Sequence, residues 1–347
     1  MTNIIAFDGF DLYNGTGANT GLQSGWGARN WFYGPSLVAG RFGGQALQMG
    51  NGLCETSLPI PAMSAFAVCH AVRVTNLASI NDSGTEPATN LLSGGNHQIG
   101  WRPTSTGAIS VYRGNTLVGT TIAGVLRSNV WHFVEFFGNI SQSGAVNIVV
   151  DGASRLALTG QNTNNYITTT TIDTIVLGAA GNAGNATQIT LGGNNLTWDD
   201  FYVTDGASLG ERRIEVLHPT ADTVQKDFTP DTGTVNYSRV NETLADSSNY
   251  VQASTVGNLD LYTMGDLSST PTAIDAVQLT VFAQKTDAST RAVALVADVS
   301  GTRAQTADFT LAVGVTRRTG IMPTAPAGGA WTASSVNAMT VGPKVTL

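Results

Sequence analysis

The chain has 347 residues, of which 42% are hydrophobic and only 12% are charged, and its formal net charge at pH 7 is −7. This length exceeds that of a usual single domain and predicts two domains, each with a core of its own. The acidic balance, with no basic cluster larger than a pair of arginines, excludes a phosphate-binding surface, so no nucleic-acid partner is expected.

Short segments in which apolar and polar residues alternate recur along the N-terminal part of the chain. This period of two predicts β-strands, because successive side chains of a strand point to opposite faces. One segment ends in Asp151-Gly152, a strong hairpin-turn signal. The segments are 66–74, 108–113, 131–137, 146–151, 172–177 and 198–203. Because no helical pattern separates them, residues 1–206 are predicted to form a β-sandwich or barrel.

The composition changes after residue 206. Residues 207–250 begin with the densest charge of the chain and continue as a polar stretch, which is typical of a linker or a long ordered loop. Strand patterns return at 276–283, 292–297 and 308–313, and predict a second, smaller β-domain over 251–347. No apolar run approaches the roughly 20 residues needed to cross a bilayer, so membrane insertion is not expected.

The acidic pair Asp199 and Asp200 follows Trp198 in a predicted strand. Carboxylate oxygens are ligands that calcium prefers, so the pair is a candidate calcium site. Calcium takes six to eight oxygens, however, and two carboxylates supply only a fraction of them. Capping of a turn is the alternative role for at least one of the two.

Trp26 and Trp31 lie in a glycine-rich segment near the N-terminus. Flat aromatic rings suit the faces of pyranose sugars, so these two residues are the candidate glycan contacts. Inward packing of either ring is the alternative. Trp131 and Trp198 stand in alternating strands and are predicted to belong to the core.

No constellation for catalysis is visible in the sequence. The histidines are scattered, Cys-X-X-Cys and Gly-X-Ser-X-Gly are absent, and Glu135 is the one carboxylate of its strand, among aromatic neighbours. A hydrogen-bonded structural role is expected for Glu135. The sequence therefore predicts a protein that is not an enzyme and that needs no cofactor, calcium being the one candidate ion.

The two cysteines, Cys54 and Cys69, lie in apolar, strand-like surroundings. The N-terminus lacks the basic and apolar regions of a secretory signal, and thiols stay reduced where proteins are made inside a cell. Buried free thiols are therefore expected, with a disulfide as the alternative.

Two blocks of sequence resemble proteins of tailed bacteriophages. The segments 7–13 (FDGFDLY), 130–135 (VWHFVE), 144–152 (GAVNIVVDG), 160–163 (GQNT) and 196–205 (LTWDDFYVTD) resemble the concanavalin-A-like, or laminin-G-like, jelly rolls of virion proteins. The segments 209–222 (LGERRIEVLHPTAD), 228–233 (FTPDTG), 246–251 (DSSNYV) and 256–262 (VGNLDLY) resemble the region that follows such a domain in many tailed-phage structural proteins.

This resemblance implies an all-β fold, in which a jelly-roll sandwich precedes a smaller β-sandwich. It implies a component of the virion, either a capsid fibre or decoration protein or a tail fibre or tip protein, made in the host cytoplasm. Its expected partners are other virion proteins and copies of itself, in a homo-oligomer such as a trimer. Binding of a host-surface glycan is an additional role, a lectin-like receptor-recognition module is the alternative function, and a glycan-degrading enzyme is the third reading.

Overall fold

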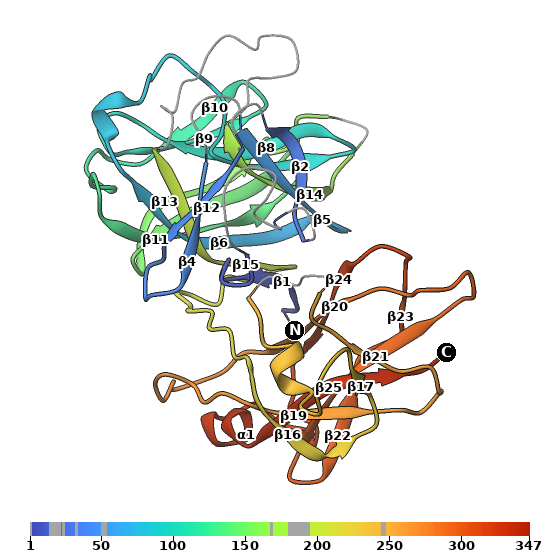
Figure 1. The fold of residues 1–347 in the computed structure, drawn as a ribbon. Helices are drawn as coiled ribbons and strands as arrows, with labels where there is room; N and C mark the ends of the chain where they lie inside the picture. Colours follow the sequence, from blue (N-terminus) through green and yellow to red (C-terminus); the bar gives the residue numbers. More distant parts are fainter. Residues whose placement is uncertain are drawn as a thin grey trace. The chain divides into compact units, whose positions relative to one another are not determined.

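The computed structural model describes residues 2–13, 22, 25–31, 34–49, 54–166, 169–179, 195–243 and 248–347. The chain divides into two compact units, Met1–Ile214 and Glu215–Leu347 (Figure 1). Strands dominate both units, and α1 (Ala333–Asn337) is the one α-helix of the described residues, beside the short 3-10 helices η3 (Leu77–Ser79) and η4 (Tyr237–Arg239). Among these helices none has the length and apolar character to cross a membrane. The all-β class predicted from the sequence is confirmed.

The first unit is a sandwich of two antiparallel sheets. The eight-stranded sheet has the order β13-β12-β11-β6-β15-β4-β3, with β1 also paired to β15, and the seven-stranded sheet has the order β10-β9-β8-β7-β14-β5-β2. The strands of the first sheet are β1 (Ile4–Asp8), β3 (Ser36–Ala39), β4 (Gln45–Gln48), β6 (Ala65–Val74), β11 (Trp131–Asn139), β12 (Gly144–Val150), β13 (Ala153–Gln161) and β15 (Leu196–Thr204). Those of the second are β2 (Gly27–Trp31), β5 (Cys54–Met63), β7 (Thr89–Ser93), β8 (Asn96–Pro103), β9 (Ile109–Arg113), β10 (Thr116–Thr120) and β14 (Ile172–Ala179). This is the predicted jelly-roll sandwich.

The eight-stranded sheet is buried on both faces near its centre. Alternate residues of β6 and β11, such as Val68 and Phe136, point into the core between the sheets. The intervening residues form a second apolar cluster on the outer face, where Cys69, Phe133 and Tyr202 meet. The alternation read from the sequence is therefore correct for β11, which has aromatic residues on either side.

The central strand β15 has all nine residues buried. One edge pairs with β6, while the other edge is shared by β1 at residues 201–204 and by β4 at Thr197 and Trp198. The ladder with β6 shifts register between Asp199 and Tyr202, and Asp200 has a φ of 49°. A β-bulge of this kind re-aims side chains, and here it carries the acidic pair.

The second unit is a smaller sandwich. A six-stranded sheet has the order β16-β19-β25-β21-β22, with β23 also paired to β21, and the pair β20–β24 packs against it. Their bounds are β16 (Pro219–Lys226), β19 (Asp260–Met264), β20 (Val277–Ala283), β21 (Ala292–Val299), β22 (Thr302–Gln305), β23 (Phe309–Thr310), β24 (Thr316–Met322) and β25 (Met339–Val345). A short pair, β17 (Thr229–Pro230) with β18 (Val251–Gln252), completes the unit. Leu279, Leu295 and Trp331 lie in its core.

Two details differ from the sequence-based expectations. The stretch 207–250 contains β16, which pairs with β19 as the outermost strand of the six-stranded sheet, so this part of the expected linker is an element of the second unit. Over 308–313, only Phe309–Thr310 forms a strand, because pairing with β21 is limited to two residues. Cys54 and Cys69 are both buried and are not joined in a disulfide, as expected.

Candidate functional site

The acidic pair lies inside the bulge of β15 and is engaged by protein donors. Asp199 accepts hydrogen bonds from the backbone N–H of Arg41 at 2.7 Å and of Asp200 at 2.8 Å. Asp200 Oδ1 accepts from the backbone N–H of Ile214 at 2.8 Å, and its Oδ2 lies 3.7 Å from Arg41 Nη1. The pair therefore ties the turn after β3 and the end of the first unit to the central strand.

The turn between β3 and β4 is shaped to approach these carboxylates closely. A Cβ on Gly40 would lie 2.9 Å from Asp199 Oδ2 and 2.5 Å from the carbonyl oxygen of Gly43, so a larger residue at position 40 displaces the turn. Asp11 holds the far side of the turn by accepting from the backbone N–H of Gln45 at 2.6 Å. Two carboxylates thus fix one short turn.

Burial dominates the electrostatics of this site. It raises the pKa of Asp199 to about 7, with a further rise from the neighbouring charge of Asp200. It also raises the pKa of Asp200 to about 6, although the N–H of Ile214 and the charge of Arg41 act in the opposite direction. Among the described residues no group of three or more His, Cys, Asp or Glu side chains is placed to hold a metal ion. Calcium at Asp199 and Asp200 stays a prediction, without a third carboxylate to support it.

The glycan-contact prediction for Trp26 is wrong. Its side chain is 1% exposed, its Nε1 donates to Asp8 Oδ2 at 3.0 Å, and its ring meets Phe201 edge-on at 5.0 Å. Tyr13 OH donates to the same carboxylate oxygen at 2.6 Å. A ring enclosed in this way offers no face to a sugar. Trp31 belongs to β2, but its side chain lies outside the described residues.

Residues 207–214, which we call the strap, cover part of the outer face of the eight-stranded sheet. The Ser208 hydroxyl donates to Glu135 Oε2 at 2.5 Å, so Glu135 is a satisfied, buried carboxylate. Tyr202 OH accepts from the backbone N–H of Leu209 at 3.0 Å and donates to the carbonyl oxygen of Gly210 at 2.7 Å. The sequence indicated none of these contacts. Ser208 is 73 residues away from Glu135, and Leu209 and Gly210 reach Tyr202 because the chain turns back after β15, which no local pattern marks.

Two further features complete the surroundings of the strap. Cys69 Sγ lies 3.4 Å from Ser208 Oγ, and burial raises the pKa of this thiol to about 12. In the middle of the strap, Glu211 forms an ion pair with Arg41. The guanidinium group of Arg41 also lies 4.7 Å from the centre of the half-exposed Phe42 ring.

His70 occupies the middle of the first unit's core. It is fully buried, its ring stacks on those of Trp101 and Phe201 with centroid distances of 5.7 Å and 6.4 Å, and its Nε2 lies 2.9 Å from Thr89 Oγ1. Burial lowers the pKa of His70 to about 3, so the ring is neutral at physiological pH.

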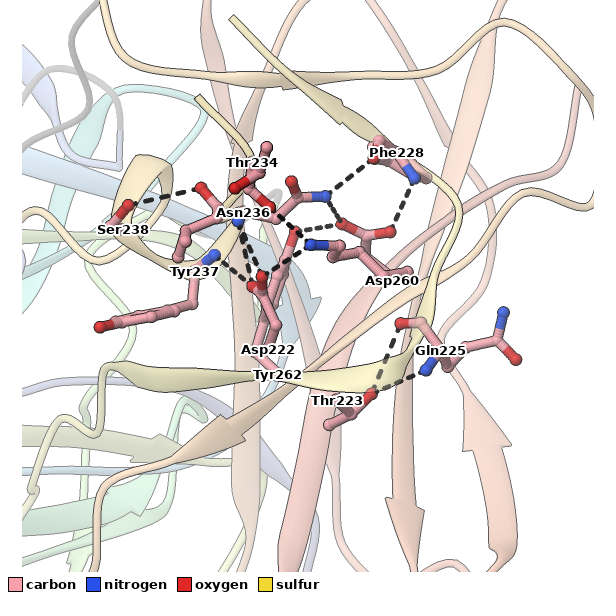
Figure 2. Close-up of polar contacts among 12 residues, drawn as sticks. Asp222, Thr223, Gln225, Phe228, Thr234, Asn236, Tyr237, Ser238, Asp260 and Tyr262 are labelled. Atoms are coloured by element: carbon pink, nitrogen blue, oxygen red, sulfur yellow. Dashed lines mark hydrogen bonds and ion pairs between the residues drawn. The ribbon is translucent and has the colours of Figure 1, made fainter. Parts of the chain in front are cut away.

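In the second unit a buried polar network is centred on Asp260 (Figure 2). The side chain of Asp260 is 0% exposed and accepts three hydrogen bonds: from the backbone N–H of Phe228 at 2.8 Å, from Asn236 Nδ2 at 2.7 Å and from Tyr262 OH at 2.7 Å. Burial, reinforced by the charge of Asp260, raises the pKa of Tyr262 far above its ordinary value. The network joins β19 to the loop that contains η4.

Asp222 of β16 extends this network toward the surface. It accepts from the backbone N–H of Tyr237 at 2.6 Å and from that of Asn236 (Figure 2). It also forms an ion pair with Lys226 at 3.1 Å. Burial works against ionisation of Asp222, but the two N–H groups and the ammonium of Lys226 prevail and lower its pKa. The sequence did not predict that these residues would meet.

Comparisons with known proteins find similar solved structures but no matching family or curated sequence. No protein-family model matches the sequence, and no curated protein matches it. Solved structures with a similar arrangement include an alginate lyase (12% identity, 62% of this chain and 98% of that chain, TM-score 0.36) and the binding domain of Paraclostridial Mosquitocidal Protein 1 (13% identity, 51% and 43%, TM-score 0.36). A Trypanosoma rangeli sialidase in complex with sialic acid is another (14% identity, 50% and 28%, TM-score 0.36). At these values the likeness assigns no activity or ligand to this chain.

One sequence-based expectation is corrected by this result. The chain was expected not to be an enzyme, but two of these three solved structures are enzymes, so the exclusion of catalysis is withdrawn. The absence of contiguous motifs does not exclude catalysis, because in a sandwich the reacting groups can come from several strands that are far apart in sequence.

Proposed function

We propose that this protein is a structural component of a tailed-phage virion, as a capsid fibre or decoration protein or as a tail fibre or tip protein. One observation carries the proposal. Asp222, Phe228 and Asp260, which belong to three separate segments of the phage-like sequence block, are joined through Asn236 in one hydrogen-bond network. A resemblance that arose from composition alone would leave such residues scattered. Their convergence supports a shared fold in the second unit.

The surface chemistry of the chain suits assembly with other proteins. Only 12% of the residues are charged, and assembly interfaces are depleted of charge at their centres because charges are costly to desolvate. Half-exposed or fully exposed apolar side chains such as Phe42, Ile122 and Val224 are present on the described surface. Copies repeated on a symmetric particle would form a closed homo-oligomer, such as a trimer.

The direct test is to look for the chain in purified particles. Antibodies against the recombinant protein are used for immunogold labelling of phage that carry the gene, and peptide mass spectrometry measures its copy number relative to the major capsid protein. We expect labelling at a fixed place on every particle and a stoichiometric copy number. Complete absence from washed, gradient-purified particles, with the protein found only in the lysate, would contradict the proposal.

A further inference from the structure

The strap is attached to the first unit in a different way from the strands. No β-strand is assigned between residues 207 and 214, so the strap is not part of either sheet ladder. Its hydrogen bonds to the sheet use side chains as donors or acceptors. Among them are Ser208 to Glu135, Leu209 and Gly210 to Tyr202, and Ile214 to Asp200.

The strap also contributes little apolar surface to the fold. Leu209 is the strap residue that packs against the outer apolar cluster, while Ala207, Glu211 and Arg213 are exposed. The strands beneath it, by contrast, are held by backbone hydrogen-bond ladders and by a core on their inner face. Segments with few buried apolar contacts and exposed backbone open at lower free energy than the sheets that they cover.

We propose that residues 207–214 form a releasable strap, which detaches from the outer face of the eight-stranded sheet while the sandwich stays folded. Release converts the end of the first unit into a tether, because residues 206–214, once extended, can span roughly 30 Å. It also uncovers Cys69, whose Sγ lies against Ser208 when the strap is closed.

The two thiols of the chain provide an internal test. Cys69 lies under the strap, whereas Cys54 lies in the core between the two sheets. The full chain is incubated with N-ethylmaleimide under native conditions, and peptide mass spectrometry follows the modification of each cysteine. We expect Cys69 to react at least about tenfold faster than Cys54, because local opening precedes global unfolding. Hydrogen exchange measured in parallel should be faster at residues 208–214 than in β6 and β11.

Variants separate strap release from a general loosening of the fold. Tyr202→Phe removes the hydroxyl that bonds to Leu209 and Gly210, and Ser208→Ala removes the donor to Glu135. Both should accelerate modification of Cys69 several-fold while leaving Cys54 unchanged, whereas Ser154→Ala on the exposed face of β13 should alter neither. Equal rates for the two thiols, with both following the global unfolding transition in urea, would overturn the proposal. So would the absence of any modification of Cys69 below that transition.

Discussion

Asn236 donates a 2.7 Å hydrogen bond from its side-chain amide to Asp260, and both side chains are completely buried. The same amide also donates to the carbonyl oxygen of Phe228 at 2.9 Å. A single asparagine therefore fixes the loop before η4 against β19. The backbone N–H of Asn236 also donates to Asp222. Asn236 therefore connects β16 and β19, two strands of one sheet, through one loop.

Replacing Asp260 should destabilise the second unit more than any surface substitution. Asp260→Asn leaves three buried donors competing for one amide oxygen, and hydrogen bonds to a charged acceptor contribute about 1.5–3 kcal/mol each. We expect a loss of about 3 kcal/mol, measured by calorimetry of the full chain as a lower midpoint for the second unit. Asp266→Asn, at an exposed position, is the matched control and should change little. Equal midpoints for the two variants would contradict the structural role of Asp260.

Acidification from pH 7 should stabilise the fold, because the buried carboxylate of Asp199 in β15 becomes neutral. The pKa of Asp199 is raised to about 7, above its ordinary value of 3.8, so the folded state binds the proton more tightly than the unfolded chain does. This contribution to stability is fully present below pH 3.8 and is lost as the pH rises through 7. Between pH 7 and pH 5 the wild type should gain on the order of 2 kcal/mol relative to Asp199→Asn in urea unfolding. A constant difference between the two proteins across this range would refute the assignment.

His70 should produce a pH dependence of the opposite sign. Its pKa is lowered from 6.5 to about 3, so the neutral ring stabilises the fold fully above pH 6.5, and this stabilisation is lost as the pH falls toward 3. Compared with His70→Gln, which cannot titrate, the wild type should lose about 3 kcal/mol between pH 6.5 and pH 4. The measurement is urea unfolding of both proteins at matched pH values. Parallel pH profiles would show that His70 is not buried as described.

The stability of the isolated first unit should depend on where the chain is cut. A chain of residues 1–214 keeps the strap, whereas 1–206 loses Ser208 and the other strap contacts to Tyr202 and Glu135. We expect the shorter chain to be less stable by about 2 kcal/mol, which is the order of a few net hydrogen bonds. Urea unfolding of the two chains measures the difference. Identical midpoints would mean that the strap contributes nothing to the unit.

Trp26 should behave as a structural residue. Trp26→Phe keeps the ring contact with Phe201 but removes the donor to Asp8, and about 1–2 kcal/mol of stability should be lost. Carbohydrate binding on a glycan array, if the wild type shows any, should be the same for the variant. A loss of binding at unchanged stability would restore Trp26 as a glycan contact.

The strands of the cores could be predicted from local pattern, and the residues joined by long-range contacts could not. Alternation in 131–137 places Phe133 and Val134 on opposite faces, and both faces are buried as that pattern indicates. Strand β16 escaped prediction because it is an edge strand whose pairing with β19 is interrupted between Asp222 and Lys226, so its side chains do not alternate cleanly. Trp26 was misjudged because the partner that encloses its ring, Phe201, comes from a strand at the far end of the first unit.

The place of β15 at the centre of the eight-stranded sheet has a consequence during synthesis. This strand is the last of the sheet to leave the ribosome, and β1 pairs with it from Ile4 to Asp8. Strand β1 therefore stays unpaired until nearly all of the first unit has been translated. Contacts so distant in sequence slow folding, since the closure of a long loop precedes any gain from pairing. Until residue 204 has emerged, the growing chain exposes strand edges that a chaperone or a neighbouring nascent chain can bind.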